Sequence, residues 1–169
     1  MRALRLLALL GCLAAVAGCG HYRLGTGAEP TFATLHVAVV SSEVLLPQTT
    51  ALVTAAVRDA FAQDGRVRLV DSSEAADATL RLTLVSYGRA VSVVRPDDTG
   101  LARRFDLTLT ARATLTDHRR GTARFTDRAL VATRGAFTDS GQVPAEHQAL
   151  PLLAERLAEE ARKAALEVW

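Results

Sequence analysis

The chain has 169 residues, of which 49% are hydrophobic, and its formal net charge is +2. This length suits one domain with a single hydrophobic core. The near balance of basic and acidic residues argues against nucleic acid as a partner, because nucleic-acid-binding domains concentrate positive charge.

The first residues predict a secretory signal peptide. Arg2 and Arg5 flank a short apolar run, Leu6–Val16, which is too short to cross a bilayer. Residues 16–19, with the sequence VAGC, resemble the bacterial lipobox, in which a peptidase cuts before the cysteine and lipid is attached to it. We therefore expect cleavage before Cys19 and acylation of its sulfur and new amino terminus. An ordinary signal peptide with a chance cysteine is the alternative.

Removal of residues 1–18 would leave 151 residues in which 18 Lys plus Arg balance 18 Asp plus Glu. Cys12 would leave as well, so the acylated Cys19 would be the last cysteine. A disulfide, cysteine-ligated zinc and a cysteine nucleophile are then excluded. Several acyl chains, at about 0.8 kcal/mol per buried CH2, would anchor the protein permanently. We expect residues 19–30 to form a lipidated, Gly-rich lead and residues 31–169 to form one domain.

The first half of the domain predicts a strand, a helix and a second strand. A β-branched run at residues 35–40 is typical of a strand. Residues 47–64 carry apolar side chains at helical spacing, with Thr49 or Thr50 as a candidate N-cap and Gly65 directly after the helix. A short strand is expected at residues 66–71.

The middle of the chain has the clearest strand pattern. Apolar residues alternate with Thr and Arg at residues 80–85 and 105–115, which predicts strands with one buried and one polar face. A break within residues 78–94 is compatible with the pattern. A third strand is expected at residues 122–133, where a change of parity predicts a bulge near Asp127 and Arg128.

The C-terminal segment predicts a long amphipathic helix. Glu159 and Lys163 form a favourable i,i+4 pair on its polar face. Because proline is tolerated only near a helix start, Pro151 is expected at the first position of the main helix. The apolar stripe comprises Leu150, Leu153, Leu157, Ala161, Ala164 and Val168. Together the elements predict an α+β fold, with two helices on one face of a small mixed sheet of four to five strands.

The sequence gives no support for catalysis, a metal site or a cofactor. None of His21, His36, His118 and His147 forms a metal-ligand spacing with another histidine. His36 lies on a predicted strand, where a hydrogen-bonded structural role is expected. The serines lack the strand-turn-helix setting of a nucleophile elbow.

The order of these features resembles a known family. Residues 19–24 (CGHYRL) follow the lipobox, Ala76-Asp77-Ala78 precedes the long strand, Tyr87 lies within it, and the alternating run begins at Phe105. With the early strand and helix and the late helix, this pattern resembles the LptE family of lipopolysaccharide-assembly lipoproteins of the Gram-negative outer membrane. The resemblance spans essentially the whole chain and rests on order and spacing.

The resemblance implies a role as a plug inside the β-barrel LptD, help in assembling that barrel, and contact with lipopolysaccharide on its way to the outer leaflet. The polar residues of the predicted outer sheet face could line a polar barrel lumen, or they could form an ordinary solvated surface. These residues are Arg81, Thr83, Thr108, Thr110, Arg112 and Thr114.

The family's basic residue in the loop between the long strands corresponds to Arg95, and Arg103 and Arg104 lie close to it in sequence. Guanidinium groups grip phosphate oxygens bidentately. Asp97 and Asp98 could instead pair with these arginines. A second basic position of the family has no counterpart, since residues 138–148 contain no Lys or Arg.

An Asp directly after the lipidated cysteine commonly resembles an inner-membrane retention signal, but this position is Gly20. We therefore expect the protein to be anchored in the outer membrane, on its periplasmic side. A small α+β adaptor lipoprotein of another outer-membrane secretion or transport assembly is the alternative function. The partner distinguishes the two, because only the first requires a large β-barrel.

Overall fold

Three long antiparallel strands form the body of a mixed sheet. The computed structural model describes residues 30–46, 48–94, 102–137 and 142–167. The strands of the body are β4 (Ala78–Val94), β5 (Ala102–Asp117) and β6 (Thr122–Phe137). The shorter strands are β1 (Thr34–Val37), β2 (Ser41–Ser42) and β3 (Arg68–Leu69), and the helices are α2 (Thr49–Asp64) and α3 (Gln142–Leu166).

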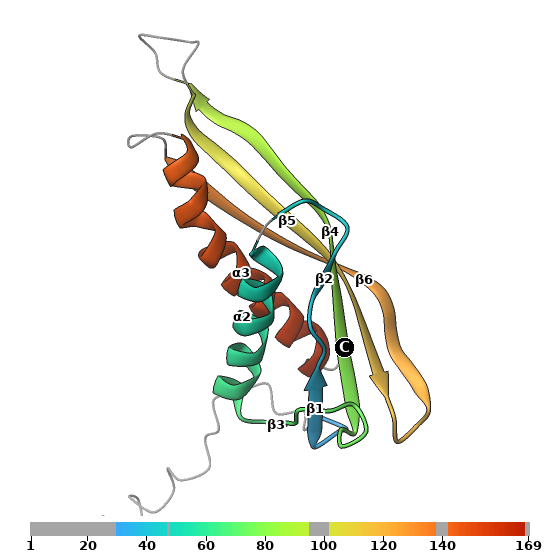
Figure 1. Ribbon diagram of the computed structural model, residues 1–169. Coiled ribbons are helices and arrows are strands. Elements are labelled where there is room, and N and C mark those ends of the chain that lie inside the picture. Colours follow the sequence, from blue (N-terminus) through green and yellow to red (C-terminus); the bar gives the residue numbers. More distant parts are fainter. Residues whose placement is uncertain (1–29, 47, 95–101, 138–141, 168–169) are drawn as a thin grey trace, which may run out of the picture.

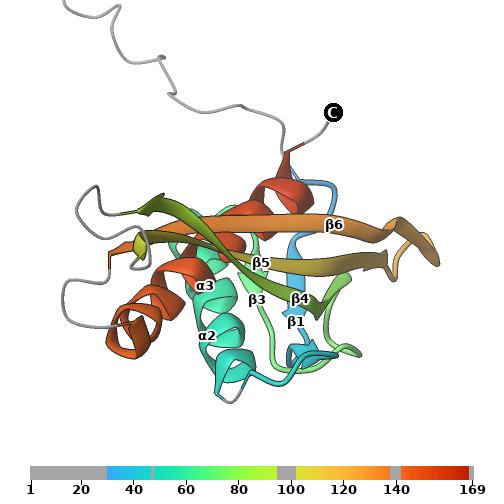
Figure 2. The same cartoon turned by 90° about the horizontal axis from the view of Figure 1, so that it is seen from above.

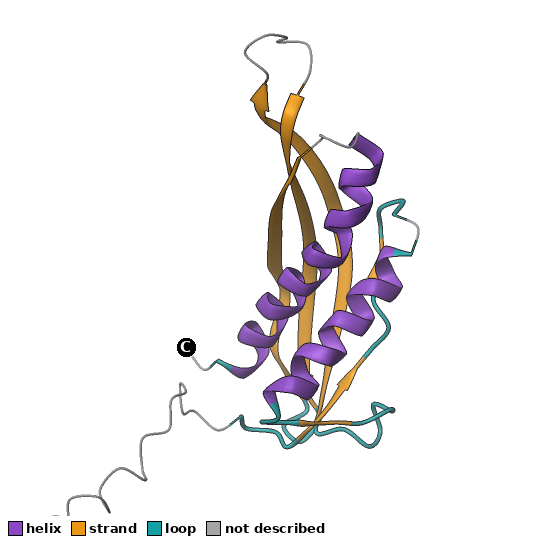
Figure 3. Cartoon of the chain, turned by 90° about the vertical axis from the view of Figure 1, so that its left-hand side faces the viewer, coloured by secondary structure: helices purple, strands orange, loops and turns teal. Residues whose placement is uncertain are grey.

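The sheet order is β3-β1-β4-β5-β6, and β2 pairs with β4. β1 is parallel to β3 and β4, whereas β4, β5 and β6 are antiparallel neighbours (Figure 1). Both helices lie on the same side of the strands (Figure 3). The predicted α+β fold, with two helices on one face of a mixed sheet, is confirmed.

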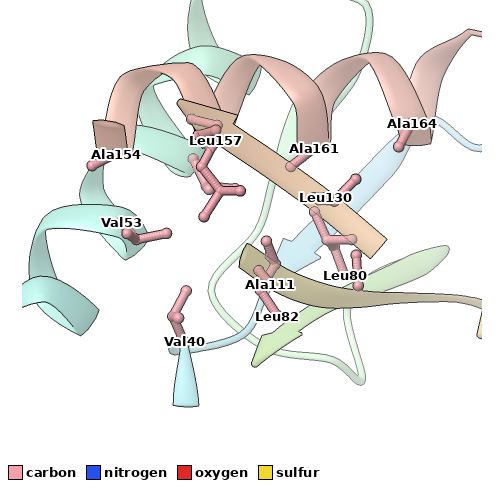
Figure 4. Packing of buried hydrophobic residues seen from close by; sticks show 14 of the residues in the cluster. Val40, Val53, Leu80, Leu82, Ala111, Leu130, Ala154, Leu157, Ala161 and Ala164 are labelled. Atoms are coloured by element: carbon pink, nitrogen blue, oxygen red, sulfur yellow. The ribbon is translucent and has the colours of Figure 1, made fainter. Parts of the chain in front are cut away.

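Alternation along the strands creates the core. In β5, Leu107, Leu109 and Leu115 are buried against the helices, while the threonines between them face away. The helices contribute fully buried side chains such as Val53 from α2 and Leu157 from α3 (Figure 4). The predicted apolar stripe of the last helix is buried from Leu153 to Ala164, while Val168 lies outside the described residues.

The ends of α2 agree only in part with the prediction. Gly65 closes the helix with φ 70°, and its N–H donates to the carbonyl of Phe61 at 3.3 Å, as expected. The predicted threonine N-cap is wrong, because Gln48 occupies the cap with φ 65° and makes no side-chain cap hydrogen bond. Thr49 is instead the first helical residue, and its side chain is buried in the core.

The predicted start of α3 at Pro151 is also wrong. α3 begins at Gln142 and continues through Pro151. An internal proline costs about 3 kcal/mol because it removes one backbone hydrogen bond and crowds the preceding turn. The turns before it bury Ala145 and Ala149 against the core, and we attribute the longer helix to this packing.

The strand boundaries differ from the predictions in length. β1 ends at Val37 and β3 has only two residues, so both are shorter than expected. The sequence allowed a break in the strand within residues 78–94, but β4 is continuous there. Its pairing with β5 has a register shift between Leu84 and Ser86 instead. The bulge predicted near Asp127 is confirmed by a φ of 51° and by shifted pairing with β5.

Asp77 joins the start of β4 to the start of β1. Its Oδ2 accepts the backbone N–H groups of Ala33 at 2.9 Å and Thr34 at 3.0 Å. The N–H of Thr34, followed by that of Ala33, lowers the pKa of Asp77 because both stabilise its charged form.

Candidate functional site

The sheet face opposite the helices is open and polar. All six residues predicted for this face lie on it, at half-buried or exposed positions. Thr83 Oγ1 lies 2.9 Å from Ser41 Oγ, and Thr108 Oγ1 lies 3.3 Å from Thr133 Oγ1. The hydroxyls and guanidinium groups give this face hydrogen-bonding capacity over the length of the long strands.

Arg81 and Arg112, the two arginines predicted for the open face, differ in their surroundings. Arg112 forms an ion pair with Glu43, which follows β2. Arg81 has no ion-pair partner among the described residues. This part of the face therefore combines one ion-paired arginine, one arginine without an ion pair among the described residues, and several neutral hydroxyls.

The end of the sheet at the β4–β5 connection carries Arg104 on the open face. Its Nη2 lies 3.2 Å from Asp106 Oδ1, and its guanidinium stacks over the Phe137 ring at 5.6 Å. Gly135 makes this arrangement possible, since a Cβ there would lie 2.6 Å from Arg104 Nε. The Arg104 side chain is still 40% exposed, so it has room to contact a ligand.

Arg89 lies at the same end of the sheet, on the face that the helices cover. It forms an ion pair with Glu146 of α3 and stacks over the Phe105 ring at 5.2 Å. Burial raises the pKa of Tyr87, and the Glu146 carboxylate raises it further. Two arginines, each stacked on a phenylalanine, thus lie on opposite faces of one end of the sheet.

Of the three arginines predicted to contact the ligand, the structure describes the side chain of Arg104 alone. Arg95 and Cys19 lie outside the described residues, as do the alternative partners Asp97 and Asp98. Arg103 belongs to β5, but its side chain also lies outside them. Arg104 is described, and the carboxylate beside it is Asp106, which the sequence did not single out.

Two of the described histidines, His36 and His118, lie beside hydrogen-bonding partners. His36 Nδ1 lies 3.2 Å from the Val70 carbonyl, and His118 Nε2 lies 2.8 Å from Thr79 Oγ1. His147 is exposed near the start of α3. No group of three or more potential metal ligands occurs among the described residues.

A groove of about 780 Å³ runs between α2 and α3. Alanines line much of it, and an ion cluster lies at the C-terminal end of α2. Asp64 accepts hydrogen bonds from Arg66 Nε at 2.6 Å and Arg162 Nη1 at 2.5 Å. Arg162 also donates to both carboxylate oxygens of Glu159, at 3.0 and 2.6 Å. This cluster fixes the two helices to each other.

The ion cluster makes stability depend on pH. Hydrogen bonds from Arg66 and Arg162, respectively, lower the pKa of Asp64 and Glu159 below their ordinary values of 3.8 and 4.5. A lowered folded-state pKa stabilises the fold above the ordinary value, and this stabilisation is lost as pH falls through the folded-state value. We expect Arg162→Ala to lower the free energy of unfolding by about 1–2 kcal/mol at neutral pH and to flatten its decline below about pH 4.5.

Urea unfolding at several pH values measures this effect. Arg156→Ala is the matched control, because Arg156 is an exposed arginine of the same helix without an ion pair among the described residues. It should change stability by less than about 0.5 kcal/mol. Equal effects of the two substitutions would show that the cluster does not stabilise the helix pair.

No described helix is both long enough and apolar enough to cross a membrane.

The comparisons with known proteins identify the family. A family model described as LptE, lipopolysaccharide-assembly, matches residues 32–164. The chain belongs to the LptE family. This is an assembly family and not a family of enzymes. No curated protein sequence matches the chain.

Solved structures share the fold of this LptE-family chain. XCC0632 from Xanthomonas campestris is 12% identical, with a TM-score of 0.60, and the match covers 82% of this chain and 85% of that one. Lipoprotein B from Nitrosomonas europaea is 12% identical, with a TM-score of 0.52 and coverages of 85% and 90%. A minor lipoprotein from Acinetobacter baumannii is 17% identical, with a TM-score of 0.50 and coverages of 78% and 91%. At these identities the likeness concerns the fold alone.

Proposed function

We propose that the mature protein is an outer-membrane lipoprotein that plugs an LptD-type β-barrel, assists assembly of that barrel and takes part in delivering lipopolysaccharide to the outer leaflet. The family match over residues 32–164 is the observation that carries this proposal.

The open sheet face supports the plug role. A barrel lumen is polar, so a domain seated in it needs hydrogen-bonding groups on its surface. The open face offers threonine hydroxyls and the exposed Arg81, while both helices cover the opposite face. The domain can therefore expose a polar sheet to a larger partner without exposing its core.

The sequence around Cys19 supports the anchor. Acylation would hold the domain at a bilayer by its N-terminal lead, since two or more buried acyl chains suffice for stable attachment. Gly20 favours the outer membrane, and the domain would then face the periplasm.

Arg95, Arg103 and Arg104 are the proposed contacts for lipopolysaccharide. Guanidinium groups suit phosphorylated sugars because they donate paired hydrogen bonds to phosphate oxygens. Arg104 supports this role by its partial exposure, and its aromatic neighbour Phe137 offers an apolar surface beside the charge.

Depletion of the protein in its native bacterium tests the assembly role. We expect less correctly assembled LptD-type barrel and less lipopolysaccharide at the cell surface, and we expect the wild-type gene to restore both. Normal levels of barrel and surface lipopolysaccharide would contradict the proposal and would favour an adaptor for another assembly.

The ligand contact has a separate test. Arg95→Asp should weaken binding of purified lipopolysaccharide by about tenfold, because it replaces a phosphate-binding charge with a repulsive one. Arg120→Asp is the matched control, since Arg120 is an exposed arginine in the β5–β6 connection at the other end of the sheet. Fluorescence titration measures both variants. Unchanged binding by Arg95→Asp would remove this loop from the proposal.

A further inference from the structure

β6 is an edge strand with a long regular stretch. It pairs with β5 on one side and ends the sheet order, so its other side has no strand partner within the described part of the chain (Figure 2). Pairing with β5 runs without a register shift from Ala129 to Phe137. This stretch is longer than a typical strand of about five to six residues and offers unpaired backbone N–H and C=O groups.

The two halves of the β6 edge differ in how strongly they discourage pairing with another strand. Residues 122–128 carry Arg124, Asp127 and Arg128 and contain the bulge, and charges and bulges both discourage strand pairing. Residues 129–137 contain Arg134 as their one charged residue and no proline. Val131 is 51% exposed and Phe137 is 60% exposed. The unprotected half is therefore suited to accept another strand.

A hollow of about 460 Å³ lies beside this half of the edge. It is lined by Thr133 and Arg134 of β6 and by Leu152, Glu155, Arg156 and Glu159 of α3. Arg134 and Arg156 have no ion-pair partner among the described residues, whereas Glu159 pairs with Arg162. Counted over the described residues, the hollow thus has two guanidinium groups without an ion pair, those of Arg134 and Arg156, against one such carboxylate, that of Glu155.

We infer that residues 129–137 of β6 accept an extended, acidic segment of a partner protein by β-strand addition. The backbone hydrogen bonds of the edge supply affinity, and pockets for alternate side chains supply selectivity in this mode of recognition. A carboxylate on the incoming segment would lie near Arg134 and Arg156, and an apolar side chain would cover Val131. This inference is independent of the proposed barrel and ligand.

Charge selects this occupant over a second copy of the chain. Arg134 is the one charged residue of the accepting stretch, and Arg156 lines the hollow beside it, so pairing two copies of this stretch would bring basic residues together without an acidic complement. An acidic strand instead complements them. The edge at the opposite side of the sheet is β3, which has only two residues and offers much less backbone.

A defined peptide tests the inference on the folded protein. The probe is an acetylated peptide of alternating valine and glutamate, about seven residues long. We expect it to bind and to slow hydrogen exchange at backbone amides of residues 129–137. A lysine version should bind at least about tenfold more weakly, and a version N-methylated at every backbone amide should not bind, because it lacks all backbone donors.

Charge reversal on the protein supplies the matched pair of variants. Arg134→Glu should weaken binding of the acidic peptide by about tenfold, whereas Arg81→Glu should leave it within about twofold. Arg81 is the control because it is an exposed arginine on β4, two strands away from the edge. Circular dichroism verifies that both variants fold.

Three results would overturn the inference. These are no protection of the β6 amides by the acidic peptide, equal weakening by Arg134→Glu and Arg81→Glu, and a dimer in sedimentation that protects the same amides without peptide. The last would assign the edge to a second copy.

Discussion

Replacing Leu157 with alanine is expected to lower the free energy of unfolding by about 3–5 kcal/mol. Leu157 is fully buried in the core cluster between α3 and the sheet, which also includes Leu130 and Ala161 (Figure 4). The substitution removes buried methyl and methylene groups and leaves a cavity, and both effects destabilise the fold. A loss of this size is a large fraction of the stability of an ordinary domain. Urea unfolding followed by circular dichroism measures it.

Leu152→Ala is the matched control on the same helix. Leu152 is 40% exposed, so the same substitution removes less buried surface and should cost less than about 1 kcal/mol. Losses of equal size would show that α3 does not bury Leu157 as described.

Replacing Cys19 with alanine is expected to abolish membrane attachment. The proposed anchor depends on acylation of this cysteine, and no other cysteine remains after cleavage. Without acyl chains the hydrophobic free energy of anchoring, about 0.8 kcal/mol per CH2, is lost entirely. Fractionation and intact-mass measurement should find an uncleaved or soluble protein without lipid.

Cys12→Ala is the control for this experiment. Cys12 lies in the segment that we expect to be removed, so its replacement should leave cleavage, acylation and membrane attachment unchanged. If Cys19→Ala still fractionated with membranes, or if the wild-type mature mass carried no lipid, the anchor would be wrong.

Features set by short sequence patterns could be predicted. Alternation of period two in residues 105–115 directly determines which side chains of β5 are buried. The bulge near Asp127 was predicted from the point where the alternation changes phase. The end of α2 was predicted from Gly65, because glycine adopts positive φ without steric cost. These features need no knowledge of distant contacts.

Features that depend on tertiary packing could not be predicted. Proline is expected to begin a helix, yet α3 extends past Pro151 towards the N-terminus because that extension buries alanines. Thr49 has the side chain of a good N-cap but is buried instead. Local preference predicts each position correctly only when the surrounding core does not override it.

The candidate site shows the same limit. Arg104 could be selected from sequence as a basic residue near the β4–β5 connection, but its neighbours Asp106, Gly135 and Phe137 depend on the register between β5 and β6. The pairing of Arg89 with Glu146 joins residues 57 positions apart. The stacking of Arg89 on Phe105 and of Arg104 on Phe137 could be predicted only if the registers of β4 with β5 and of β5 with β6 were known.

The partner of the native protein is the most direct test of the central claim. The lipidated protein should be purified from detergent-solubilised outer membrane and its companions identified by mass spectrometry. We expect an LptD-type β-barrel in comparable amount, together with a mature mass that includes acyl chains on Cys19. Recovery of an acylated protein with no such barrel would contradict the account.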